Sequence, residues 1–127
     1  MSFTVLIVDD SKLARMSVAR VLGTLYPQWK RIEAANAIEA LEQTKQLSPE
    51  VALVDFNMPG KDGVTLAAEL RSLHPKISVA VISANRQVEV IRRTEAAGAT
   101  FLAKPLTEAA LADFLSSTLK HRKPGSP

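Results

Sequence analysis

The stretch ALVDFNMPGKDG, residues 52–63, runs from apolar residues into an aspartate and then turns on a proline and two glycines. Residues 51–55, VALVD, have the near-continuous apolar character of a strand covered on both faces. Asp55 is therefore expected at the carboxyl end of a buried strand. Burying a carboxylate is costly unless it is paired. The residues expected near Asp55 therefore indicate why a buried strand ends on an aspartate.

The same alternation of apolar runs and helical periodicity occurs five times along the chain. This pattern predicts an α/β fold of the (βα)5 type with a parallel sheet. We expect strands at 4–8, 30–34, 51–55, 78–83 and 100–103. We expect helices from Ser11 to Pro27, from an Asn36 cap, from 62–63 to about Leu73, from about Arg86 to Gly98, and from Thr107.

Polar residues end four of these strands: Asp9 and Asp10, then Asp55, Ser83 and Lys104. The carboxyl ends of parallel strands meet at one edge of a sheet, which is where open α/β sheets bind ligands. Clustered carboxylates repel one another unless a cation is present, and an all-oxygen site suits hydrated Mg²⁺. Beside a metal and a lysine, an aspartate can attack phosphorus and form an aspartyl phosphate.

The motifs VDDS, VDFNMPGKDG, ISAN and AKP, in this order and spacing, resemble the receiver domain of two-component response regulators, the chemotaxis-type proteins included. The resemblance implies a doubly wound, flavodoxin-like sheet with strand order 2-1-3-4-5. It also implies a phosphoacceptor module that switches a partner and is not an enzyme in the usual sense.

The resemblance implies a role for each residue of the cluster. Asp55 would be the phosphoacceptor and a Mg²⁺ ligand, Asp10 a direct ligand, and Asp9 a ligand largely through water. The backbone carbonyl of Asn57 would complete the protein's share of the metal site. Lys104 would pair with the phosphoryl group, and its peptide bond to proline would be cis.

Two further residues would carry the signal outward. Ser83 matches the hydroxyl residue that contacts the phosphoryl group, and Phe101 matches the aromatic switch residue. The surface built by the fourth helix, strand 100–103 and the last helix would then meet a downstream protein or a second copy. The phosphodonor would be a sensor histidine kinase or a phosphotransfer protein. For Phe101 the alternative is an ordinary core aromatic.

Two other classes of protein fit this sequence less well. A haloacid-dehalogenase-like phosphatase also forms an aspartyl phosphate, but it needs a second aspartate two residues later, where this chain has Asn57. A nucleotide or flavin binder needs a glycine-rich loop after the first strand, whereas DDSKLA would repel phosphates.

Composition sets the limits of the molecule. With 127 residues the chain fits one domain, and we assign 1–120 to a receiver domain and 121–127 to a basic flexible tail or linker stub. Net charge is +3, and the tail holds much of it, so nucleic-acid binding is not expected. Short apolar runs and the absence of cysteine favour a cytoplasmic protein without a membrane segment. We interpret it as a stand-alone receiver, with a fragment of a longer regulator as the alternative.

Overall fold

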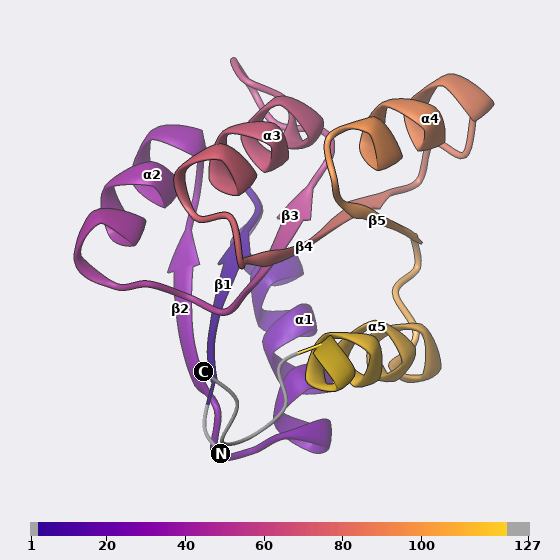
Figure 1. The fold of residues 1–127 in the computed structure, drawn as a ribbon. Coiled ribbons are helices and arrows are strands. Elements are labelled where there is room, and N and C mark those ends of the chain that lie inside the picture. Colours follow the sequence, from indigo (N-terminus) through magenta and orange to yellow (C-terminus); the bar gives the residue numbers. More distant parts are fainter. Residues whose placement is uncertain (1–2, 122–127) are drawn as a thin grey trace.

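The computed structural model describes residues 3–121, in which strands and helices alternate along the whole chain (Figure 1). All five predicted strands have the predicted bounds. The elements are β1 (Thr4–Val8), α1 (Lys12–Leu25), β2 (Lys30–Ala34), α2 (Ala37–Gln46), β3 (Val51–Asp55), α3 (Gly63–Leu73), β4 (Ser78–Ser83), α4 (Val88–Ala96), β5 (Thr100–Ala103) and α5 (Glu108–His121).

The strands form one parallel sheet in the order β2-β1-β3-β4-β5, as the resemblance implied. The register aligns the strand ends: Val8 pairs with Ala34 and Val54, and Ser83 pairs with Ala103. The residues at and just beyond these ends therefore share the carboxyl edge of the sheet. Strands β1 and β3 are buried almost throughout, which explains their continuous apolar sequences.

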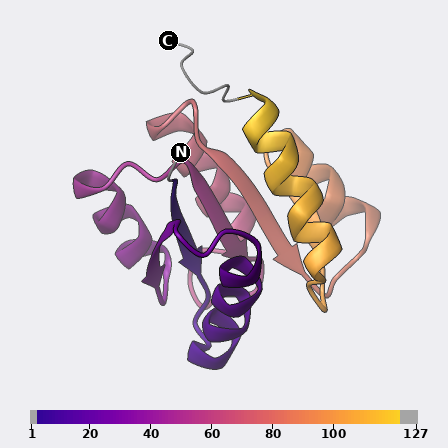
Figure 2. The same cartoon turned by 90° about the horizontal axis from the view of Figure 1, so that it is seen from below.

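Helices cover both faces of the sheet. In Figure 1, α2, α3 and α4 lie on one face, and Figure 2 shows α1 and α5 in front of the other. Each face has its own buried cluster. Leu6, Val54 and Leu66 belong to the cluster under α2 and α3, whereas Leu53 and Leu111 belong to the one under α1 and α5. The apolar side chains of β1, β3 and β4 thus alternate between the two cores, and both cores stabilise the sheet.

Polar caps define the helix starts at the carboxyl edge. The side chains of Ser11, Asn36 and Asp62 each accept a hydrogen bond from the backbone N–H three residues later. One predicted start differs. Helix α4 begins at Val88 and not near Arg86, because the side chain of Asn85 accepts from the N–H of Gln87 and holds 84–87 as a loop.

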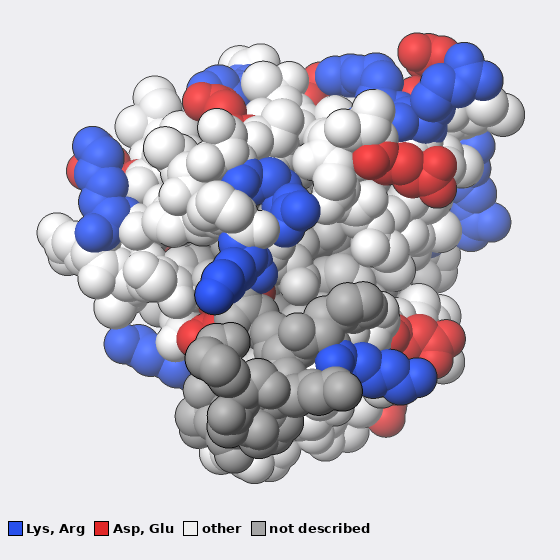
Figure 3. Space-filling view, in the orientation of Figure 1, with Lys and Arg blue, Asp and Glu red and all other residues white. Residues whose placement is uncertain are grey.

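The surface carries mixed charge. Figure 3 shows Lys and Arg side chains interspersed with Asp and Glu around α4, and one such neighbouring pair is Glu89 and Arg92. Within residues 3–121 no helix has the length and apolar character needed to span a membrane. Residues 122–127 of the predicted tail lie outside the described part of the chain.

Candidate phosphorylation site

The predicted acids meet at the carboxyl edge of the sheet. Asp9 and Asp10 follow β1, and Asp55 is the last residue of β3. One carboxylate oxygen from each of the three lies within 4.8 Å of the others. Asp9 and Asp55 are buried, whereas Asp10 is exposed. Three like charges at this spacing repel one another, and a cation held between them would offset that repulsion.

The carboxyl of Asp9 has a raised pKa in this cluster. Asp9 is only 6% exposed, and its burial raises the pKa of its carboxyl above the usual value. A hydrogen bond of 2.9 Å from the N–H of Ser11 offsets part of that effect. The charges of Asp55 and Asp10 raise the pKa of Asp9 further, and that of Lys104 lowers it. The folded chain therefore carries unfavourable charge at Asp9 at neutral pH.

Lys104 brings the opposite charge to Asp55. Its Nζ lies 2.6 Å from Oδ1 of Asp55, and its backbone N–H donates to the carbonyl of Ser83 at 3.0 Å. The peptide bond between Lys104 and Pro105 is cis, as the resemblance implied. The lysine is partly exposed at the mouth of the site, while the aspartate is buried. The pair combines a carboxylate shielded from water with a cation that faces the entrance.

The close approach of α3 holds Asp55 in place. A Cβ added at Gly63 would lie within 2.3 Å of the carbonyl oxygen of Asp55, so only glycine fits at this first residue of the helix. The N–H of Gly63 also donates to the carbonyl of Phe56 at 2.9 Å. The turn NMPGKD therefore folds back tightly after Asp55 and keeps its carboxylate at the edge of the sheet.

Ser83 is buried at the end of β4, next to the loop that leads to α4. Its Oγ accepts a hydrogen bond of 2.9 Å from the N–H of Asn85 and lies 3.3 Å from the carbonyl of that residue. The hydroxyl is thus engaged with its own loop. Any group that attracts this hydroxyl toward the pocket must pull against the loop 84–86.

The donor set fits Mg²⁺. The clustered ligands are carboxylate oxygens, which this ion prefers, and few protein ligands leave room for water. Oδ1 of Asp55 is buried and makes no hydrogen bond to any group of residues 3–121, although it forms the ion pair with Lys104. A bound cation would give that oxygen a further partner. Asn57 lies exposed on the loop after β3, and the role of its carbonyl stays a prediction.

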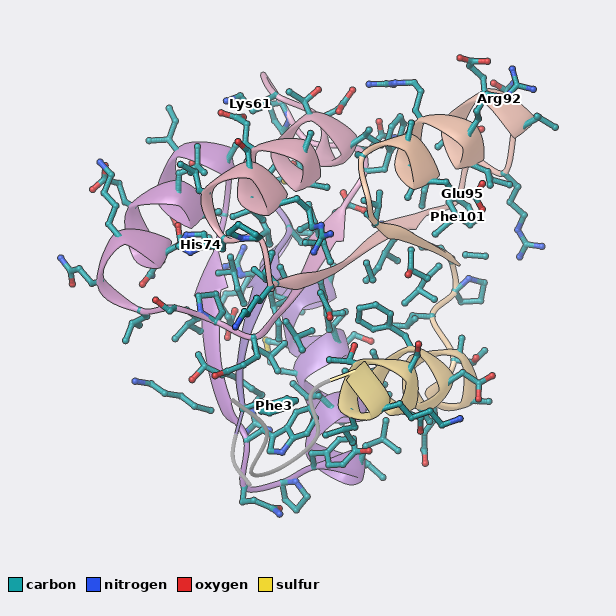
Figure 4. The ribbon with its side chains drawn as sticks, viewed as in Figure 1. Phe3, Lys61, His74, Arg92, Glu95 and Phe101 are labelled. Carbon is teal, nitrogen blue, oxygen red and sulfur yellow. The ribbon has the colours of Figure 1, made fainter. Side chains whose placement is uncertain are left out.

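Phe101 lies on β5, two residues before the carboxyl end of that strand (Figure 4). Its neighbour Leu102 belongs to the core under α1 and α5, so Phe101 points to the opposite face, the side of α4. It is half-buried and belongs to neither core cluster of the described residues. This position differs from that of an ordinary core aromatic, and its role as a switch stays a prediction.

The structure adds interactions that sequence reasoning missed. Arg93 of α4 reaches Oδ2 of Asp62 at 3.2 Å and so joins the loop after β3 to α4. Burial tends to raise the pKa of Asp62, but hydrogen bonds from Thr65 and Arg93 outweigh it and lower the pKa below the usual value. Arg15 contacts the carbonyl of Asp9 from α1. Charge pairs between distant elements leave no periodic signal in the sequence.

A cavity of about 500 Å³ adjoins the site between α1 and the segment after β5. Its lining includes the charged residues Asp9 and Lys104 and the apolar residues Val18, Val21 and Leu106. Lys104 therefore lines this cavity and also pairs with Asp55 in the acid cluster.

Comparison with known proteins gives consistent matches. The model of the response regulator receiver domain matches residues 5–116. The chemotaxis protein CheY of Thermotoga maritima is 31% identical over 91% of this chain and 97% of its own length. A CheY4 structure from Vibrio cholerae superposes with a TM-score of 0.83 at 27% identity, covering 94% of this chain and all of that one.

A further structure shows a relative with a partner. The chain is 27% identical to a chain of the CheX-CheY-BeF3-Mg²⁺ complex from Borrelia burgdorferi, with a TM-score of 0.82. The match covers 92% of this chain and 89% of that one.

Proposed function

The chain belongs to the response regulator receiver domain family, and we propose on that premise that it accepts a phosphoryl group on Asp55 in a two-component system. Receiver domains are regulatory modules and not classical enzymes, so its only chemistry would be its own phosphorylation and dephosphorylation. The observation that carries the proposal is the buried Asp55 carboxylate, grouped with Asp9 and Asp10 and paired with Lys104 at 2.6 Å.

In the proposed reaction a carboxylate oxygen of Asp55 attacks the phosphorus of a phosphohistidine or of a small acyl phosphate. A bond between this oxygen and phosphorus forms, the bond to the donor breaks, and its electron pair leaves with the donor. The ammonium group of Lys104 would move from the carboxylate to the phosphoryl oxygens and offset their charge. Mg²⁺, held by Asp9, Asp10, Asp55 and the carbonyl of Asn57, would supply further positive charge there.

Ser83 would couple this chemistry to the surface. Its hydroxyl is bonded to Asn85 in the present structure, and phosphoryl oxygens are stronger acceptors than a backbone carbonyl. Movement of the hydroxyl toward Asp55 would draw the loop 84–86 with it. Phe101, which lies on the α4 side of β5 outside both cores, would rotate into the space released. The surface of α4, β5 and α5 would then change its fit to a partner.

The proposed partners follow from this arrangement. A sensor histidine kinase or a phosphotransfer protein would donate the phosphoryl group, and a downstream protein or a second copy would bind the α4, β5 and α5 surface. Mixed surface charge around α4 gives no support to direct nucleic-acid binding. We place the protein in the cytoplasm, where such kinases act, with residues 1–120 as the receiver and 121–127 as a tail.

Intact-mass measurement tests the proposal. Incubation with Mg²⁺ and acetyl phosphate should add one phosphoryl group to the wild type and to Asp113→Asn, whose aspartate is exposed on α5. Asp55→Asn and omission of Mg²⁺ should each abolish the gain. Labelling that survives Asp55→Asn would place the chemistry elsewhere. Steady turnover of a generic phosphomonoester, without accumulation of the phosphoprotein, would indicate a phosphatase.

A further inference from the structure

Arg15 of α1 makes contacts that tie the acid cluster to the rest of the fold. Its Nε lies 2.8 Å from Oε1 of Glu33 on β2, and one terminal nitrogen donates to the carbonyl of Asp9 at 2.5 Å. The side chain is only 15% exposed. A guanidinium withdrawn from water in this way needs fixed partners, and here it has one charged and one neutral acceptor.

The bond to Asp9 matters because of where that carbonyl lies. The backbone N–H of Asp9 donates to Ala34 at 3.1 Å, and its carboxylate accepts from Ser11. The carbonyl is the remaining polar group of Asp9, and it belongs to the peptide that joins the two acids. Since a peptide unit is planar, fixing this oxygen also fixes the N–H of Asp10 and the direction in which Asp10 leaves the strand.

Asp10 depends on this support. Its carboxylate is exposed and makes no hydrogen bond or ion pair with residues 3–121. Its orientation therefore rests on the backbone that precedes it and on the helix that follows. We propose that Arg15, held by Glu33, is a positioning residue that fixes the Asp9–Asp10 peptide and so orients the two acids for Mg²⁺, an inference that rests on the proposed function.

A role as a counter-charge is less consistent with the structure. Arg15 contacts a neutral carbonyl and not a carboxylate of the cluster, and it directs its charge to Glu33. The cation that lowers the pKa of Asp9 is Lys104. The arginine thus holds the acids in place without competing for the site that Mg²⁺ would occupy. A lysine at position 15 would keep the positive charge. It lacks the planar guanidinium with which arginine contacts two acceptors at once.

Titration with MgCl₂, followed by the amide resonances of Asp9, Asp10 and Ser11, tests the inference without any phosphodonor. Arg15→Lys should weaken Mg²⁺ binding about 10-fold, the lower end of the usual loss when a residue supporting metal ligands is changed. Arg20→Lys, on the exposed side of the same helix, should bind Mg²⁺ as the wild type does. Glu33→Gln should give a smaller loss, since an amide oxygen can still accept from Arg15.

Melting curves without Mg²⁺ show whether each variant is folded. If Arg15→Lys does not fold, the Mg²⁺ titration of Glu33→Gln provides the test. Phosphorylation of Arg15→Lys should recover at saturating Mg²⁺, because the reacting groups are intact. Wild-type affinity in both Arg15→Lys and Glu33→Gln would overturn the positioning role alone. A wild-type protein that binds no Mg²⁺ would contradict the proposed function as well.

Discussion

At the scale of single residues, the burial of Asp9 lowers the stability of the fold at neutral pH. Its carboxyl is buried beside two other acids, and its pKa is raised chiefly by that burial. Between the usual value of 3.8 and the raised value, the folded state binds more protons than the unfolded state. The free energy of unfolding therefore falls as the pH rises through this range, and the full penalty applies at neutral pH.

Asp9→Asn should consequently stabilise the protein at neutral pH without Mg²⁺. We expect an increase of about 0.5–2 kcal/mol in the free energy of unfolding, the usual result of relieving an unfavourable charge. The asparagine oxygen can still accept from Ser11, so local structure should persist. Urea unfolding measures the change. The difference from wild type should shrink as the pH falls below 3.8, and a variant less stable than wild type at neutral pH would contradict the account.

At the scale of elements, α3 approaches Asp55 closely through Gly63. The helix starts so close to β3 that a Cβ at this residue would overlap the carbonyl of Asp55. Backbone atoms cannot move aside as the end of a side chain can. A larger residue here must therefore displace either the start of the helix or the end of β3, which carries Asp55.

Gly63→Ala should destabilise the protein by about 1–3 kcal/mol or more, as overpacking of a well-packed interior does. It should also slow phosphorylation of the fraction that remains folded. Gly60→Ala is the matched control: Gly60 has φ of +80°, but a Cβ there meets no atom within 4 Å. It should cost roughly 1–2 kcal/mol through backbone strain, and it should lower the rate of labelling less than Gly63→Ala does, because its Cβ does not displace the backbone of Asp55. Equal labelling rates in Gly63→Ala and wild type would refute the positioning role of α3.

Most helices and strands could be predicted from the sequence, whereas contacts between distant residues could not. Continuous apolar strands and capping residues such as Ser11 and Asn36 have local signatures, so element types and most bounds were predicted correctly. The start of α4 was predicted two residues early, because the Asn85 side chain stabilises a loop that periodicity does not reveal. The contacts of Arg15 with Asp9 and Glu33 depend on strand register and side-chain direction, which one sequence does not specify.

At the scale of the whole molecule, the pocket and α4 are connected from two sides. Ser83 bonds to the loop that enters α4, and Arg93 of α4 bonds to Asp62, which lies on the loop after β3. Helix α4 itself is weakly anchored, since it buries only Val90 and Thr94, whereas α3 buries five residues. If phosphorylation favoured one of two positions of such a helix by a few kcal/mol, most molecules would adopt that position.

The most direct test asks whether chemistry at Asp55 changes the surface of α4, β5 and α5. Backbone amide resonances are recorded with and without BeF3 and Mg²⁺, in the wild type and in Ser83→Ala. In the wild type, BeF3 in place of the phosphoryl group should shift resonances in 84–97 and 100–104 as well as those of the pocket. Ser83→Ala should retain the pocket shifts and lose the distant ones, while Ser72→Ala, an exposed serine of α3, should behave as wild type. Wild-type shifts confined to the pocket, or distant shifts that survive Ser83→Ala, would contradict the coupling we propose.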